Sequence, residues 1–338
     1  MPLQIDILVW RGSIPESRHR VQAAVVDRQG HRIEGTEHAD LITTFRSAAK
    51  PFQLLPLVER GHADRWRLSQ EELAVMAASH TGAESHVRLV RDLLARFGLG
   101  EGHLACGFHE PLDPGSLAYV RAHPQERSPL YNNCSGKHAG MLCLALSEGW
   151  PARGYEQPDH PVQRLMRATV AELCGLPPES LGVGVDGCGV SVFGLPLTGM
   201  ARAYAHLAAA EPGGSARERA LHRIRTAMSE HPKAVGGDGR FSTALMERTS
   251  GRMVAKGGAE GLECVGLPAR GFGIAVKCED GQARGLSAAT VALLEHLGEL
   301  SPEELDRLSA SRRPVLHNDA GTEVGALEAS VQVVSHTA

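Results

Sequence analysis

The stretch Phe45-Arg46-Ser47-Ala48-Ala49-Lys50-Pro51-Phe52-Gln53 places a serine three residues before a lysine at the start of an apolar segment. The apolar residues that continue it, at helical spacing, are Phe52, Leu54, Leu55, Leu57 and Val58. A spacing of three puts Ser47 and Lys50 on the same side of a helix, so the amine can reach the hydroxyl. Pro51 is tolerated in the first turn. The stretch therefore predicts a Ser-Lys couple at a helix start.

This couple has a recognisable chemistry. A serine hydroxyl is a weak nucleophile that needs a neighbouring base, and a lysine amine becomes that base when burial and nearby positive charge lower its pKa. The positive end of the helix would also favour a developing oxyanion. The same pattern arises by chance about once in a chain of this length, so an ordinary helix start is the alternative.

Two further segments strengthen the catalytic interpretation. Ala78-Ser79-His80-Thr81-Gly82 follows an apolar helical pattern, and Arg252-Met253-Val254-Ala255-Lys256-Gly257-Gly258 places a lysine at the end of an apolar strand, before two glycines. Each segment also has a non-catalytic interpretation. The first can be an ordinary helix C-terminus, and the second can be a surface lysine in a turn. In order, the three segments resemble the signature of serine β-lactamases and penicillin-binding proteins. Here Ser-His-Thr replaces Ser-Asp-Asn, and Lys-Gly-Gly replaces Lys-Thr-Gly.

The rest of the chain predicts an α+β fold. Residues 1–10 predict a first strand, and residues 21–26 and 32–34 flank a turn as a hairpin. Ser69 and Glu72 have the spacing of a capping box. Further expected helices are 84–97, 136–147, 162–174, 216–229 and 287–297, and further expected strands are 182–193, 252–256 and 271–277. Strands at both ends with helices between them predict a central sheet that joins the two ends, and a helical lobe.

Two glycine-rich segments contain thiols. Residues 131–141, Tyr-Asn-Asn-Cys-Ser-Gly-Lys-His-Ala-Gly-Met, precede a helix, where backbone donors can point at a ligand. Val185-Asp186-Gly187-Cys188-Gly189 ends an apolar strand. Cys134 and Cys188 could bind a soft metal, but the spacing Cys-x-x-Lys does not by itself predict zinc, because lysine must first lose a proton. The alternative is two glycine-rich turns with buried thiols.

Composition limits the classes of protein that fit. The 338 residues are 42% hydrophobic and 22% charged, with a net charge of -4, which is typical of a globular chain and a poor fit to nucleic-acid or membrane partners. Seven scattered cysteines predict free thiols. We expect a soluble cytoplasmic protein without a signal peptide or membrane span, with residues 1–338 forming a single domain of two closely packed lobes.

Together these motifs identify a family resemblance. Residues 45–53, Ser79-His80-Thr81-Gly82, residues 132–138 and Asp186-Gly187-Cys188-Gly189 resemble the rhizobial-type, or class 3, asparaginases. The resemblance covers nearly the whole chain. It implies a serine β-lactamase/transpeptidase-like fold with a mostly antiparallel sheet, a homodimer, and hydrolysis of L-asparagine to L-aspartate and ammonia without an organic cofactor.

The resemblance also implies roles for individual residues. It gives two catalytic couples, Ser47 with Lys50 and Ser79 with Lys256, with Ser47 as nucleophile and Lys50 as its base. It implies a zinc ion near the active site, and carries its ligands over to Cys134, Lys137 and Cys188. The candidates for holding the zwitterionic end of the substrate are Arg46, His80, His138 and Asp186. One departure is Ser242, where the family is expected to have cysteine.

Two other functions fit part of the pattern. A penicillin-recognising acyl transferase or β-lactamase would use the same Ser-Lys chemistry, but its substrates lie outside the cytoplasm. A non-catalytic module would bind zinc or an amino acid and release no ammonia. Both Ser-Lys couples are retained, which favours catalysis over binding alone.

Overall fold

The computed structural model describes residues 1–334. The chain divides into two compact units. The sheet unit consists of residues 1–43, residues 196–209 and the described residues from 244 onward, and the helical unit consists of residues 44–195 and 210–243. Whether the two units act as a single domain stays a prediction.

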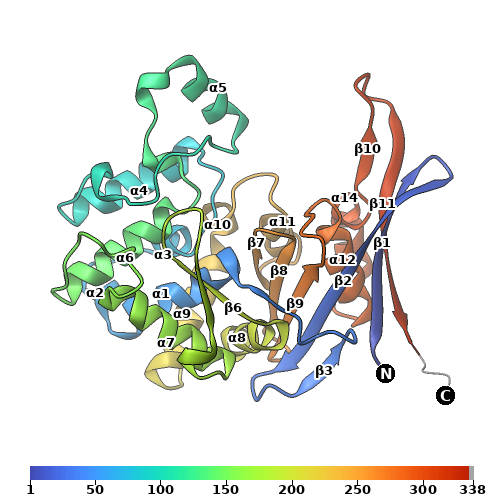
Figure 1. Cartoon of the computed structure of the whole chain (residues 1–338), viewed down its shortest axis with the longest axis horizontal. Helices are drawn as coiled ribbons and strands as arrows, with labels where there is room; N and C mark the ends of the chain where they lie inside the picture. The colour runs from blue at the N-terminus through green and yellow to red at the C-terminus, as the bar shows by residue number, and fades with distance from the viewer. Residues whose placement is uncertain (335–338) are drawn as a thin grey trace. The chain divides into compact units, whose positions relative to one another are not determined.

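The sheet unit is built on an antiparallel sheet in the order β10-β11-β1-β2-β9-β8-β7, with β3 paired to β2 (Figure 1). Its strands are β1 (Leu3–Arg11), β2 (Ile14–Asp27), β3 (Arg32–Gly35), β7 (Val254–Gly258), β8 (Leu262–Leu267), β9 (Phe272–Cys278), β10 (Val315–His317) and β11 (Glu323–Val333). β1 and β11 pair from Leu3 with Val333 to Arg11 with Gly325. The expected sheet that joins the two ends of the chain is therefore confirmed.

Helices cover both faces of this sheet. A Cβ added to Gly273 of β9 would lie 1.8 Å from the carbonyl oxygen of Ala201 in α8 (Leu197–Ala209), so only glycine allows this approach. A Cβ on Gly285, just before α12 (Leu286–His296), would lie 2.6 Å from Ile7 of β1. The strand register puts Gly273 and Ile7 on opposite faces. The unit also holds α13 (Pro302–Arg307) and α14 (Ser309–Arg312).

The helical unit surrounds α1, whose residues from Lys50 to Val58 are all buried, with α6, α7 and α9. Its helices are α1 (Lys50–Glu59), α2 (His62–Arg65), α3 (Gln70–Met76), α4 (Glu84–Arg96), α5 (Pro114–Ala122), α6 (Ser135–Ser147), α7 (Pro161–Cys174), α9 (Ala216–Glu230) and α10 (Pro232–Val235). Its 3-10 turns are η1 (Arg46–Ala49), η2 (Glu101–His103), η3 (Pro124–Glu126), η4 (Pro129–Tyr131) and η5 (Pro178–Ser180). β4 (Ile42–Thr44) and α11 (Phe241–Arg248) lie where the sequence passes between the units.

The α+β class with a mostly antiparallel sheet and a helical part is confirmed, as are the hairpin of β2 with β3 and the Ser69–Glu72 capping box. One expected strand is wrong as a continuous element. Residues 182–193 form β5 (Gly182–Val185) and the start of β6 (Ser191–Pro196), because the turn between them brings the Asp186 N–H to the Val190 carbonyl at 2.8 Å. Lys256 lies inside β7 and does not end it, since both following glycines belong to the strand.

None of the helices within residues 1–334 combines the length and the hydropathy that crossing a membrane requires. All seven cysteines are free thiols and all are buried, as expected.

Candidate active site

Lys50 begins α1 with a fully buried side chain. Its Nζ donates hydrogen bonds to the carbonyl oxygen of Ala78 at 2.5 Å and to Ser79 Oγ at 2.9 Å, with a weaker contact to the Asn133 carbonyl at 3.5 Å. The S-x-x-K lysine and the second motif serine, 29 residues apart in sequence, are therefore direct partners.

Ser47 lies one turn earlier, in η1, where its carbonyl accepts the backbone N–H of Lys50. The Phe45 N–H donates to the Phe193 carbonyl at 2.8 Å, which ties the start of η1 to β6. Ser47 is half-buried, and its hydroxyl makes no hydrogen bond within the described residues. Its hydroxyl is therefore not committed to another group of the described chain.

The surroundings of Lys50 affect its protonation. Burial lowers the pKa of the Lys50 amine, the sulfur of Cys134 opposes this effect, and the charge of Lys137 adds to it. The net pKa is lower than that of an ordinary lysine, in the direction that a general base requires.

Cys134, Lys137 and Cys188 meet in one buried group, although the last is 51 residues beyond Lys137. Lys137 Nζ donates to Cys188 Sγ at 3.0 Å, and Cys134 Sγ lies 3.2 Å from Asn133 Oδ1. α6 supplies Lys137 and has Cys134 as its N-cap residue, while the turn after β5 supplies Cys188. We call these three residues the thiol-lysine cluster.

The two sulfurs of this cluster share one hydrogen bond. That bond, reinforced by the charges of Lys50 and Lys137, holds the pKa of Cys134 well below its usual range despite burial. The same bond and burial raise the pKa of Cys188. Burial disfavours the ammonium of Lys137, but the negative charge of the sulfurs outweighs it and raises the Lys137 pKa. These surroundings therefore favour a negative charge on Cys134 over one on Cys188.

The donor set of the cluster fits zinc. Two sulfurs and one nitrogen converge from the N-terminal end of α6 and the turn after β5, and thiolate with nitrogen is a combination that zinc prefers. Lys137 would have to lose a proton to become a ligand. The Asn133 amide oxygen beside Cys134 would be an outer partner.

Arg46 and Asp186 form an ion pair beside this cluster. Arg46 Nη2 lies 2.9 Å and Nε 3.1 Å from Asp186 Oδ1, which also accepts the Gly187 N–H at 2.8 Å. Arg46 has a positive φ of 43°, a conformation that costs a residue with a Cβ about 1–2 kcal/mol. Burial works against the Asp186 carboxylate, but the charges of Lys137 and Arg46 prevail and lower its pKa.

His80 is fully buried, and both of its ring nitrogens have partners. The Gly82 N–H donates to Nδ1 at 3.1 Å, so Nε2 carries the proton and donates to Ser135 Oγ at 2.9 Å. Ser135 Oγ in turn donates to the Leu130 carbonyl at 3.0 Å. His80 therefore links the Ser79 segment to the first residue of α6, and its contact with substrate stays a prediction.

His138 is fully buried on α6, and its ring is oriented by Tyr155. The Tyr155 hydroxyl accepts the Ala105 N–H at 2.9 Å and lies 2.6 Å from His138 Nδ1, to which it can donate. This leaves the proton on Nε2, an atom that is buried and has no hydrogen-bond partner among the described residues. A buried donor without a partner is rare in folded proteins, and a bound ligand that accepts this hydrogen bond would explain it.

Lys256 belongs to the sheet unit, whereas Ser47, Lys50 and Ser79 belong to the helical unit. Its side chain is buried, and its Nζ donates to the Gly257 carbonyl at 2.8 Å. The pairing of Lys256 with Ser79 stays a prediction.

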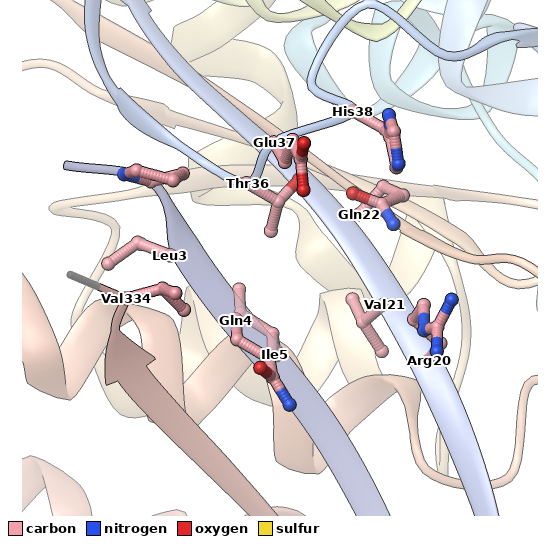
Figure 2. Close-up of a pocket in the computed structure, with 11 residues that line it drawn as sticks. Leu3, Gln4, Ile5, Arg20, Val21, Gln22, Thr36, Glu37, His38 and Val334 are labelled. Carbon is pink, nitrogen blue, oxygen red and sulfur yellow. The ribbon is translucent and has the colours of Figure 1, made fainter. Parts of the chain in front are cut away.

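None of the predicted site residues lines the cavity drawn in Figure 2. That cavity, of about 270 Å³, lies in the sheet unit between β1, β2 and the segment after β3, with Gln22 and His38 among its polar lining. This cavity therefore does not mark the position of the Ser-Lys residues.

Residues 7–329 match the sequence profile of the family described as L-asparaginase II. The chain belongs to the L-asparaginase II family. Membership confirms the asparaginase resemblance. No curated protein matches this asparaginase II family member.

Solved structures give weaker likenesses. The native form of Mglu in 4.3 M NaCl is 17% identical, with a TM-score of 0.45, and the match covers 87% of this chain and 66% of Mglu. This family member thus spans slightly less than two thirds of that protein. A beta-lactamase from Mycobacterium bovis is 14% identical, with a TM-score of 0.42 over 82% of this chain and 94% of the other.

Two contributors to the site were not anticipated from the sequence. Tyr155 orients His138 from an irregular segment between α6 and α7 and carries no motif of its own. The Ala78 carbonyl oxygen accepts a hydrogen bond from the Lys50 amine, and a backbone acceptor cannot be recognised from a pattern of side chains. Asn133, within a predicted motif, contacts both Lys50 and Cys134.

Proposed function

We propose that this L-asparaginase II family member hydrolyses L-asparagine to L-aspartate and ammonia through a serine acyl-enzyme. The observation that carries the proposal is the buried Lys50 amine, which begins α1 three residues after Ser47 and donates to Ser79 Oγ at 2.9 Å. A desolvated amine that is hydrogen-bonded to one serine and lies one helical turn from another is suited to moving protons during acyl transfer.

In the proposed reaction, neutral Lys50 takes the proton of Ser47 Oγ as that oxygen attacks the side-chain amide carbon. The tetrahedral intermediate collapses, the carbon–nitrogen bond breaks, and the leaving nitrogen receives a proton that Lys50 can pass through Ser79. Water then attacks the ester with Lys50 again as base, which releases aspartate and restores Ser47. One water is consumed for each asparagine.

The charges around the site suit a zwitterionic substrate. Asp186, held by Arg46, can accept hydrogen bonds from the substrate ammonium, while the exposed part of the Arg46 guanidinium can bind the carboxylate. The unpartnered Nε2 proton of His138 supplies a further donor. Specificity for asparagine would come from the distance between these charged groups and the Ser47 hydroxyl, which must match the length of the substrate side chain.

We propose that Cys134, Lys137 and Cys188 hold a zinc ion. When bound, zinc would supply positive charge that supports the local structure and substrate affinity. Cys134 lies against Lys50 and Asn133, so the ligands and the catalytic amine share one buried environment. A homodimer and a cytoplasmic location stay predictions from the resemblance.

The decisive experiment measures ammonia release from L-asparagine and L-glutamine by the full-length protein, with and without a chelator. We expect release from asparagine and a covalent aspartyl adduct on Ser47 in rapidly quenched samples. Labelling of Ser47 by a penicillin without ammonia release would favour a penicillin-recognising hydrolase instead. Asparagine binding without turnover would favour a non-catalytic module.

A further inference from the structure

Three potential metal ligands gather at one end of the central sheet. β2 and β9 pair with Val21 opposite Cys278, so His19, two residues before Val21, points to the same face as Cys278. Asp280 follows two residues later in the turn that leaves β9. The His19 nitrogen, the Cys278 sulfur and an Asp280 carboxylate oxygen all lie within 4.8 Å of one another.

The hydrogen bonds of this group define its protons. Arg284 Nε donates to His19 Nε2 at 2.8 Å, so the imidazole proton is on Nδ1 and points at Asp280 Oδ2, 2.6 Å away. The Cys278 thiol donates to Asp280 Oδ1 at 3.0 Å. Two protons, one from nitrogen and one from sulfur, therefore point at a single carboxylate.

We propose that His19, Cys278 and Asp280 form a second metal site, with zinc or another borderline divalent cation as its ligand. Sulfur, imidazole nitrogen and carboxylate oxygen are three donors that zinc combines, and a water can complete four-fold coordination. The thiolate and imidazole make calcium and magnesium poor fits, because those ions prefer oxygen ligands.

The burial of the three side chains is consistent with metal binding. His19 and Cys278 are buried, whereas the Asp280 side chain is 47% exposed, so the carboxylate can meet an incoming hydrated ion before the two inner ligands. The site belongs to the sheet unit and shares no residue with the thiol-lysine cluster of the helical unit.

Binding would exchange protons for the metal in a defined way. The Cys278 thiol releases its proton to solvent, and the His19 proton moves from Nδ1 to Nε2 so that Nδ1 can bind the ion. Nε2 can then no longer accept from Arg284, which keeps its 2.7 Å bond to Ser17 Oγ. Arg284 is thus a positioning residue. Its hydrogen bond stabilises the His19 tautomer of the metal-free protein and so opposes metal binding.

The test uses full-length, reduced, metal-free protein carrying Cys134→Ser and Cys188→Ser, so that the thiol-lysine cluster cannot contribute. Cd²⁺ is titrated while the ultraviolet sulfur-to-cadmium charge-transfer band is recorded, and Zn²⁺ is then added as competitor. We expect one equivalent of Cd²⁺ to bind with the band, and Zn²⁺ to displace it. Absence of the band would overturn the proposal.

Variants in that background locate the site. Cys278→Ser should abolish the band, while Cys143→Ser, which removes another fully buried thiol, should leave it unchanged. His19→Gln and Asp280→Asn should each weaken Cd²⁺ binding by at least about tenfold. Arg284→Gln should tighten it. If Cys278→Ser fails to fold by circular dichroism, unchanged affinity in both His19→Gln and Asp280→Asn overturns the proposal, as does a band that survives in folded Cys278→Ser.

Discussion

Gly136 approaches Val75 so closely that a Cβ on Gly136 would lie 2.1 Å from the Val75 carbonyl oxygen. This contact joins the first turn of α6 to the end of α3. Gly136 lies between Cys134 and Lys137 in the sequence, so the contact fixes the backbone that carries these two residues. Because the obstacle is backbone, the extra methyl cannot be accommodated by a side-chain rotation. Ordinary helix propensity would favour alanine here, so packing decides this position.

We therefore expect Gly136→Ala to lower the free energy of unfolding by about 1–3 kcal/mol, as overpacking does, and to reduce activity. Gly140→Ala, one turn later, is the matched control, since its Cβ would lie 3.4 Å from the flexible side chain of Met76. Urea denaturation measures both variants. Equal stability of the two would contradict this account of the contact.

The second prediction concerns the Lys50–Ser79 hydrogen bond. Lys50→Met keeps the length of the side chain and removes the base, and Ser47→Ala removes the proposed nucleophile, so both should abolish ammonia release while the fold is retained. Ser79→Ala should lower kcat by about 10²–10⁴-fold, the usual contribution of one proton-transfer group. Circular dichroism verifies the fold. Activity like that of the wild type in Ser47→Ala or Lys50→Met would reject the mechanism.

The third prediction concerns Asp186. Asp186→Asn keeps a hydrogen-bond acceptor beside Arg46 but removes the charge proposed to bind the substrate ammonium. We expect KM for L-asparagine to rise by at least about tenfold, equivalent to about 1.4 kcal/mol, with a smaller change in kcat. Asp92→Asn removes an exposed carboxylate from α4 and serves as control. An unchanged KM would remove Asp186 from the proposed substrate site.

The fourth prediction is a pH dependence of stability. Burial, together with the charges of His86, Lys50 and His109, holds the pKa of His80 well below its usual value. Below about pH 6.5 the unfolded chain binds a proton that the folded chain does not, so stability falls with falling pH, by at most about 1.4 kcal/mol per pH unit for this group. Above that pH, His80 contributes no such dependence.

Urea unfolding at pH 7.5 and 5.5 measures this effect. His80→Gln should reduce the loss of stability between the two values, while His103→Gln, an exposed histidine, should not. Equal pH dependence in His80→Gln and wild type would mean that His80 takes up its proton in the folded protein.

Local patterns predicted much of the fold. The Ser69–Glu72 spacing predicted the start of α3 because a capping box is a local interaction, and turn residues predicted the β2–β3 hairpin for the same reason. α8 was not predicted, since it is buried along most of its length and its alanine-rich sequence lacks a polar face. β8 was missed as well, because its residues are buried on both faces and do not alternate.

For the site, the motifs predicted which residues would matter but not how they would meet. Lys50 was expected beside Ser47, three residues away, yet its hydrogen bond goes to Ser79 because the turn after α3 returns to the start of α1. The meeting of Lys137 with Cys188 likewise depends on packing between α6 and the turn after β5. Such contacts are tertiary, and no spacing along the chain encodes them.

The pairing of β2 with β9 has a consequence during synthesis. Residues 28–271 separate these strands, and at about 5–20 residues per second a ribosome needs roughly 10–50 s to make that length. Until then the hairpin formed by β1 and β2 has unpaired edges, which favour aggregation. Until its last strands emerge, the nascent chain therefore keeps a strand edge that is open to pairing with another chain.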